Sequence, residues 1–181
     1  PGGRSVADLL QKLSPTDVDW SKVEIFMIDE RVVSIDDTES NYKQAHDLFL
    51  SRVKAQRHPF LIEKGVEKYN YEFQSAGAHF DLIVLGVGED GHIAALFPNH
   101  PALKIKGKKY IRFDDSPKLP KKRITASLDI IKDADVIFLL FVSAGKKKAY
   151  NLFVNKKTNE TECPAKIALG AKEVFVFTEF S

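Results

Sequence analysis

Asp90 and His92 have the types and the spacing of a proton-transfer pair. They lie in a glycine-rich turn, residues 86–92, which directly follows the apolar stretch Phe80–Leu85. An imidazole can take up a proton near neutral pH, and a neighbouring carboxylate stabilises the charged ring. The turn therefore predicts a site where His92 acts as a base on a small substrate, while a lone structural histidine stays the plain alternative.

The same turn has a second interpretation as a dinucleotide-binding loop. Residues 86–91 match G-x-G-x-x-G after a strand, and Asp114 lies about where a ribose-binding acid is expected. Against this, the turn carries two acidic residues where a pyrophosphate would bind. Pro98 and Pro101 also interrupt the helix that should follow. We therefore favour the small-substrate site.

Charged residues also follow another apolar stretch, Val23–Ile28. Asp29, Glu30 and Arg31 end it abruptly, and burying them unpaired would cost several kcal/mol each. We expect them to be exposed or to face a polar cleft, with an ordinary loop salt bridge as the alternative.

A phosphate-binding set is predicted near the start of the chain. Gly2, Gly3, Arg4 and Ser5 precede a helical stretch and offer backbone N–H groups, a hydroxyl and the positive end of a helix dipole. Further along the chain, fixed cations can be supplied by Arg123 and Lys148.

These residues lie between strands and helices in an alternating order. The predicted strands are Val23–Ile28, Phe80–Leu85, Tyr110–Phe113, Val136–Val142 and Glu173–Phe177. The predicted helices are Val6–Leu13, Ser40–Val53, Lys146–Val154 and Pro164–Leu169. Near-continuous apolar strands are typical of a parallel sheet that is covered on both faces. The pattern predicts an α/β fold with a predominantly parallel sheet flanked by helices and with its site at the carboxyl ends of the strands.

Composition narrows the classes of function. The 181 residues fit a single domain, and 27 basic against 25 acidic residues give a net charge of +2, too even to favour nucleic acid as a partner. The longest apolar run, Val136–Val142, is too short to span a bilayer, so no membrane role is expected. Cys163 is the sole cysteine, which favours a reducing, cytoplasmic location. No histidine and cysteine spacing indicates a metal site.

Several segments together resemble one family. Residues 80–98, FDLIVLGVGEDGHIAALFP, are similar to the signature segment of the 6-phosphogluconolactonases, in the family shared with glucosamine-6-phosphate isomerases. Residues 29–33 with 40–42, DERVV and SNY, resemble a second segment of that family. Shorter likenesses occur at 1–5, 123–125 and 145–149, in the family's order.

The resemblance implies a Rossmann-like fold and hydrolysis of 6-phosphoglucono-1,5-lactone in the oxidative pentose phosphate pathway, without a metal or organic cofactor. It implies one domain over residues 1–181 that lacks the family's N-terminal strand and helix, as a monomer or small homo-oligomer. His92 would be the base, with Asp90 and Glu30 orienting it. Arg31 would either stabilise the oxyanion or hold the sugar hydroxyls or the phosphate. The expected substrate-binding residues are Gly2, Gly3, Arg4, Ser5, Asp29, Asn41, Arg123 and Lys148.

Two alternatives stay open. A glucosamine-6-phosphate deaminase needs a glutamate five residues after the histidine, where this chain has Phe97, and an apolar ring cannot transfer a proton. A non-catalytic sugar-phosphate-binding protein on the same scaffold would bind the product without turning over the lactone. The presence of Asp90, His92 and Arg31 favours the enzyme.

Overall fold

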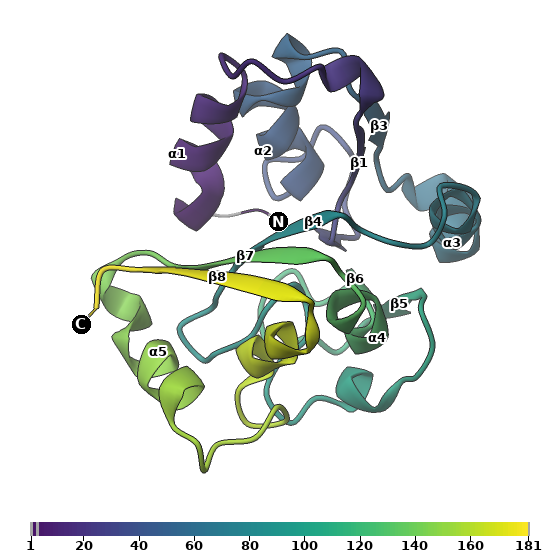
Figure 1. Ribbon diagram of the computed structural model, residues 1–181. Helices are drawn as coiled ribbons and strands as arrows, with labels where there is room; N and C mark the ends of the chain where they lie inside the picture. The colour runs from purple at the N-terminus through teal and green to yellow at the C-terminus, as the bar shows by residue number, and fades with distance from the viewer. Residues whose placement is uncertain (1, 3, 181) are drawn as a thin grey trace.

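The protein's structure, a computed structural model, describes residues 2 and 4–180, without the side chains of Arg4 and Ser5. Its strands form one parallel sheet of three, one parallel pair and one antiparallel sheet of three. Figure 1 shows the parallel pair with α1 and α2 at the top and the three-stranded parallel sheet across the middle.

The three-stranded parallel sheet has the order β4 (Leu82–Gly86), β7 (Val136–Phe141), β8 (Glu173–Thr178). The middle strand β7 is continuously apolar and holds some of the most deeply buried side chains of the core. The edge strand β8 departs from the prediction of strands covered on both faces. Its Phe175, Val176 and Phe177 are 48%, 38% and 45% exposed, so the described residues cover both of its faces only in part.

Three strands are not anticipated by the sequence. The parallel pair joins β1 (Glu24–Phe26) to β3 (Gln56–His58). The antiparallel sheet has the order β2-β6-β5, and its strands are β2 (Asp29–Arg31), β6 (Arg123–Ala126) and β5 (Tyr110–Phe113). β2 and β3 are three polar residues each, and β6 alternates polar and apolar residues over only four positions, so these three strands lack the apolar run that marks the other strands.

In the described part of the chain, five α-helices accompany the sheets: α1 (Arg4–Leu13), α2 (Asn41–Leu48), α3 (Gly65–Ser75), α4 (Leu128–Lys132) and α5 (Lys147–Val154). The predicted helix over 40–53 divides after Leu48, and a 3₁₀ turn follows at Leu50–Arg52. The predicted helix at Pro164–Leu169 is a 3₁₀ helix, Pro164–Gly170.

The helix α3 is a further element that the sequence does not predict, and it packs against the end of β1. Its Tyr69 and Phe73, four residues apart, are buried on one face. The Tyr69 hydroxyl accepts a hydrogen bond from Met27 N–H at 2.9 Å and donates to the carbonyl of His58 at 3.0 Å. These bonds join α3 to the residue that follows β1 and to the last residue of β3.

Among the described residues, two hydrophobic cores hold the sheets and helices together. The larger core surrounds β4 and β7 and includes the fully buried Leu85 and Leu139. The smaller core lies beneath α1 and α2 around Phe49 and Leu50, with Leu10 of α1 packed against it. The mixed α/β class with parallel sheets flanked by helices is therefore confirmed. Among the described residues, none of the helices has the length and apolar character needed to cross a membrane.

Candidate active site

A cleft of about 800 Å³ opens at the carboxyl ends of β4 and β7. Turns that follow these two strands form one side, and β2 and β6 form another. The residues that line it are Gly2, Asp29, Arg31, Asn41, Gly86, Val87, Gly88, Glu89, His92, Ala94, Phe97, Lys118, Leu119, Arg123, Val142, Ser143, Ala144, Gly145 and Lys146. The charged and glycine-rich segments after the predicted strands thus meet in one cleft.

The turn after β4 joins Asp90 to His92. Oδ1 of Asp90 lies 2.5 Å from Nδ1 of His92, so the carboxylate accepts a hydrogen bond from Nδ1–H and the lone pair of the neutral ring is on Nε2. Nε2 has no partner among the described residues. Gly88 permits this packing, since a Cβ there would lie 1.9 Å from Nδ1. The turn therefore presents a histidine whose Nδ1 is held by Asp90 and whose Nε2 is available to a substrate.

Residues 92–100, all of them described, contain no helix after this turn. Gly91 has φ +85°, a conformation that L side chains rarely adopt, and it directs the chain into a bridge between Ile93 and Leu96 instead. A dinucleotide site needs a helix N-terminus at this point. The geometry therefore disfavours the dinucleotide interpretation.

Lys118 completes the charged group around His92. Its Nζ lies 3.2 Å from Oδ2 of Asp90 and 3.4 Å from Nδ1 of His92. Burial would raise the pKa of Asp90, but the hydrogen bond with His92 and the charges of His92 and Lys118 outweigh it and hold this pKa well below its usual range. Asp90 is therefore ionised at neutral pH and can stabilise an imidazolium.

Arg31 and Arg123 supply positive charge on the facing wall. They lie opposite each other in the β2–β6 register. Arg123 is 5% exposed, donates to the carbonyl of Leu119 at 2.9 Å, and its buried Nε has no hydrogen-bond partner among the described residues. Burial, together with the charge of Arg31, lowers the pKa of Arg123. A buried guanidinium without a carboxylate partner is suited to an anionic ligand.

Asp29 and Asn41 form a rigid polar corner next to these arginines. Both are buried, and Asn41 Nδ2 donates to the carbonyl and to Oδ2 of Asp29 at 2.9 and 3.2 Å. Oδ1 of Asn41 is buried without a partner among the described residues and lies against Gly2.

Glu30 is buried behind the cleft and does not contact His92. Its carboxylate accepts hydrogen bonds from the backbone N–H groups of Arg31, Asn41 and Tyr42 at 2.7 to 2.8 Å and from the Ser40 hydroxyl at 3.1 Å. Burial raises the pKa of Glu30 against the opposing effect of these donors. The geometry gives Glu30 the task of fixing the start of α2 to β2, and the prediction that it orients His92 has no contact in its favour.

Most of the other sequence-predicted residues lie at the cleft. Gly2, Asp29, Arg31, Asn41, His92 and Arg123 line it, and Asp90 adjoins it through His92. Lys148 is exposed and is not among the lining residues, whereas Lys146 is. The predicted roles of Gly3 and of the Arg4 and Ser5 side chains fall outside the described residues.

Sequence reasoning did not assign Lys118 to the site. Its signal was the basic run 118–123, which is typical of a solvated loop. In the sequence, Phe97 marks only a departure from the deaminase pattern. It is buried in the structure, with its ring centroid 4.7 Å from that of His92.

One group in the described part of the chain has the composition of a metal site. Ligand atoms of His79, Asp81 and Asp135 lie within 4.8 Å of one another. The group lies away from the cleft, before the amino ends of β4 and β7, and Lys172 forms an ion pair with Asp135. The lysine neutralises charge that a cation would need, so the group fits an ion-pair network better.

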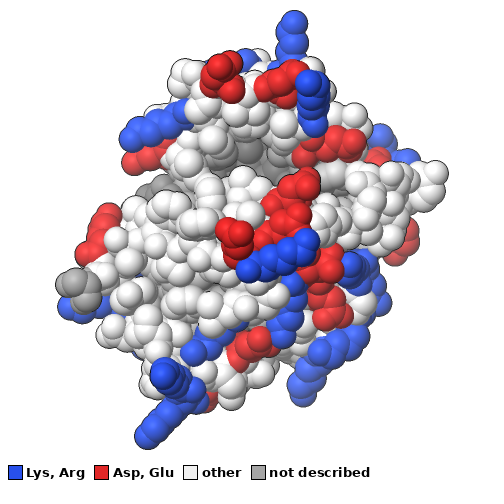
Figure 2. All heavy atoms as spheres, in the orientation of Figure 1, with Lys and Arg blue, Asp and Glu red and all other residues white. Residues whose placement is uncertain are grey.

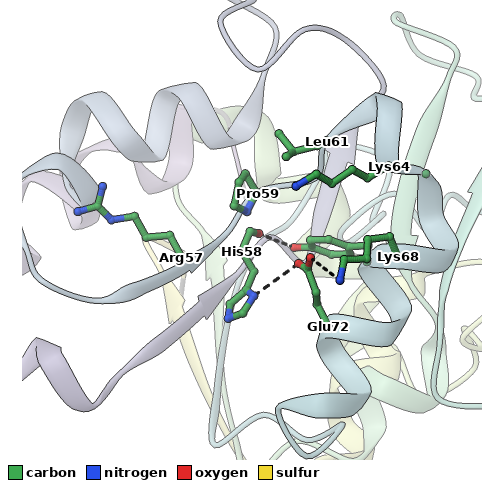
Figure 3. Close-up of a pocket in the computed structure, with 9 residues that line it drawn as sticks. Arg57, His58, Pro59, Leu61, Lys64, Lys68 and Glu72 are labelled. Carbon is green, nitrogen blue, oxygen red and sulfur yellow. Dashed lines mark hydrogen bonds and ion pairs between the residues drawn. The ribbon is translucent and has the colours of Figure 1, made fainter.

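A smaller cavity of about 370 Å³ lies between β3 and α3 (Figure 3). Glu72 offsets part of its positive charge, because it approaches His58 at 3.6 Å and Lys68 at 3.7 Å. Figure 3 shows Arg57 pointing away from the two lysines, and its guanidinium donates to the Val53 carbonyl. On the face in Figure 2, acidic and basic side chains are interspersed. The larger cleft is therefore the candidate site.

Solved structures share this fold. The crystal structure of 6-phosphogluconolactonase from Thermotoga maritima superposes with a TM-score of 0.85 at 27% identity, covering 97% of this chain and 81% of that chain. The enzyme from Shewanella baltica gives 0.86 at 26%, with coverages of 97% and 80%. A monomeric glucosamine-6-phosphate deaminase, at 18% identity and a TM-score of 0.78, has the same fold. Fold and cleft together define an α/β protein of the sugar-phosphate isomerase and lactonase class.

Sequence comparisons identify the family. The model described as glucosamine-6-phosphate isomerases/6-phosphogluconolactonase matches residues 1–176. A 6-phosphogluconolactonase from Borreliella burgdorferi is 31% identical over 189 residues, 98% of this chain and 80% of that protein. Probable 6-phosphogluconolactonase 1 from Arabidopsis thaliana is 37% identical over 158 residues, 76% of this chain and 59% of that protein. The chain belongs to the glucosamine-6-phosphate isomerase/6-phosphogluconolactonase family.

Proposed function

We propose that this chain hydrolyses 6-phosphoglucono-1,5-lactone to 6-phosphogluconate. The observation that carries the proposal is the pairing of two features in one cleft. His92 has an oriented ring with an available Nε2, and Arg123 has a buried guanidinium without an anionic partner among the described residues. A base and a fixed cation are what a phosphorylated ester needs for attack by water.

In the proposed reaction, Nε2 of His92 takes a proton from water as the water oxygen bonds to the lactone carbonyl carbon. The carbonyl electrons move to its oxygen and form a tetrahedral oxyanion. When the carbonyl re-forms, the bond to the ring oxygen breaks, and the imidazolium returns its proton to that oxygen. The product carries a free hydroxyl and a carboxylic acid, which ionises at neutral pH.

The other cleft residues divide binding and stabilisation between them. Arg31 stabilises the oxyanion. Asp29 accepts hydrogen bonds from the sugar hydroxyls, and Asn41 accepts hydrogen bonds from them or donates to them. The 6-phosphate binds Arg123 and the N-terminus of α1, which follows the cleft residue Gly2. The assignments of Arg4, Ser5 and Lys148 to the phosphate stay predictions.

The decay of freshly generated lactone, followed with and without the protein, tests the function. The uncatalysed decay is subtracted, and His92→Ala serves as the protein control. We expect the unsubstituted protein to accelerate the decay of the lactone and His92→Ala to lose that acceleration. A decay rate equal to the background at micromolar protein would refute it.

Two further assays separate the alternatives. Release of ammonia from glucosamine 6-phosphate would favour the deaminase, for which Phe97 offers no proton-transferring group. Calorimetric binding of 6-phosphogluconate without any acceleration of lactone decay would favour a sugar-phosphate-binding protein.

A further inference from the structure

Lys118 stands out among the cleft residues because it contacts the proton-transfer pair from a different part of the chain. It belongs to the segment between β5 and β6, yet its Nζ reaches both Asp90 and His92. Its side chain is 45% exposed, so the ammonium lies at the mouth of the cleft.

The segment that carries Lys118 is held by hydrogen bonds on both sides. Ser116, 2% exposed, accepts from the Lys118 N–H at 3.1 Å and donates to the Lys118 carbonyl at 2.8 Å. The next carbonyl, that of Leu119, accepts from Arg123 at 2.9 Å. Because the buried Ser116 hydroxyl binds both the N–H and the carbonyl of Lys118, it fixes the backbone position from which the Lys118 side chain extends.

The charges around His92 come from several elements. Asp90 and Glu89 belong to its own turn, and Cys163, whose pKa is raised by burial, lies beneath Gly91. The other charged groups that line the cleft are Asp29 and Arg31 of β2, Arg123 of β6 and Lys146 after β7. Among the cations of the described residues, Lys118 approaches the ring itself, with its Nζ 3.4 Å from Nδ1.

We propose that Lys118 is a positioning residue that fixes the ionised Asp90 against His92 and keeps His92 unprotonated, and therefore able to act as a base, at mildly acidic pH. Asp90 alone stabilises the imidazolium, and the ammonium of Lys118 opposes that effect. This inference rests on the proposed function for its kinetic consequence, but the electrostatic coupling itself does not depend on turnover.

Removing the charge is the first test. In Lys118→Met, the acidic limb of the pH profile of kcat/KM is expected to move up by about 0.5–1 pH unit, because an exposed cation is partly screened. Activity then falls several-fold near pH 6 and changes little near pH 8. Lys118→Arg keeps the charge and is expected to restore the position of the limb.

A matched control removes the same charge elsewhere in the segment. Lys121 is exposed, lies outside the cleft and contributes only its backbone carbonyl, to Ser116 N–H at 3.1 Å. Lys121→Met is expected to leave the limb unchanged. An equal shift in Lys121→Met would show that the effect comes from the net charge of the protein and not from the place of Lys118, and it would overturn the proposal. A uniform loss at every pH in Lys118→Met, or a rise in KM with no shift, would likewise overturn it.

Proton titration of the His92 ring by NMR separates this proposal from the proposed function. The midpoint is expected to rise in Lys118→Met, and by less in Ser116→Ala, even if the protein does not hydrolyse the lactone. An unchanged midpoint in Lys118→Met would overturn the proposal even if hydrolysis is established.

Discussion

Two histidine–carboxylate groups lie at opposite ends of β4, and only one of them is built for chemistry. His92 follows the strand, and its Nδ1 meets Asp90 at 2.5 Å while Nε2 faces the cleft. His79 precedes the strand, and both of its nitrogens are engaged, Nδ1 with Asp133 at 3.0 Å and Nε2 with Asp135 at 3.3 Å. A histidine–aspartate contact therefore identifies a base only when one ring nitrogen stays available.

The charged residues around His79 and His92 also differ between the two groups. Lys108 and Lys172 pair with the carboxylates around His79, which closes the group into an exposed ion-pair network that joins the starts of neighbouring strands. His92 instead shares its cleft with Arg31 and Arg123, which have no carboxylate within ion-pair distance among the described residues. The first group has its charges satisfied, whereas the second is complementary to an anion.

The largest expected effect is on turnover. His92→Ala is predicted to lower kcat by about 10²–10⁴-fold, the usual contribution of a general base. Because His92 is at the cleft wall rather than in the core, the thermal unfolding midpoint is expected to stay nearly the same. Turnover is measured from lactone decay and folding from circular dichroism. Near-normal kcat in a folded variant would remove His92 as the base.

The next effect is on binding. Arg123→Met is predicted to raise KM about tenfold or more, because a charged hydrogen bond contributes roughly 1.5–3 kcal/mol. Lys148→Ala, at an exposed position outside the cleft lining, is expected to raise KM by less. Calorimetry with 6-phosphogluconate supplies an independent affinity. A larger KM effect for Lys148→Ala than for Arg123→Met would place the phosphate elsewhere.

The smallest effect is on stability at the other end of β4. The hydrogen bond with Asp133 raises the pKa of His79, so its stabilising contribution is complete below the unfolded pKa of about 6.5 and disappears as the pH rises through the folded pKa. His79→Gln is predicted to lower the free energy of unfolding by less than about 1 kcal/mol at pH 5.5, since the pair is exposed, and not at pH 9. Urea unfolding at both pH values checks this, and a greater loss at pH 9 would contradict it.

The sequence predicts the parts of the fold that depend on local pattern. The apolar runs locate β4, β5, β7 and β8, and the family and the α/β class are confirmed. β2 and β3 are short polar segments whose strand form depends on pairing with partners far along the chain, and sequence periodicity does not report such pairing. The exposure of β8 likewise depends on which elements far along the chain cover its faces, although its sequence is as apolar as that of a buried strand.

The candidate site likewise has one part that the sequence predicts and one part that it does not. Asp90 and His92 are two residues apart, so their contact follows from one glycine-rich turn. Lys118 is 26 residues from His92, and its approach depends on the bonds that Ser116 and Arg123 make with its segment. Long-range placement of this kind has no signature in composition or spacing.

The most direct test compares the two groups in one experiment. Initial rates of lactone hydrolysis are measured side by side for the unsubstituted protein, His92→Ala and His79→Ala at saturating substrate. The account predicts that His79→Ala keeps the unsubstituted rate within about twofold, while His92→Ala loses 10²-fold or more. Equal losses in the two variants, or a greater loss in His79→Ala, would contradict it.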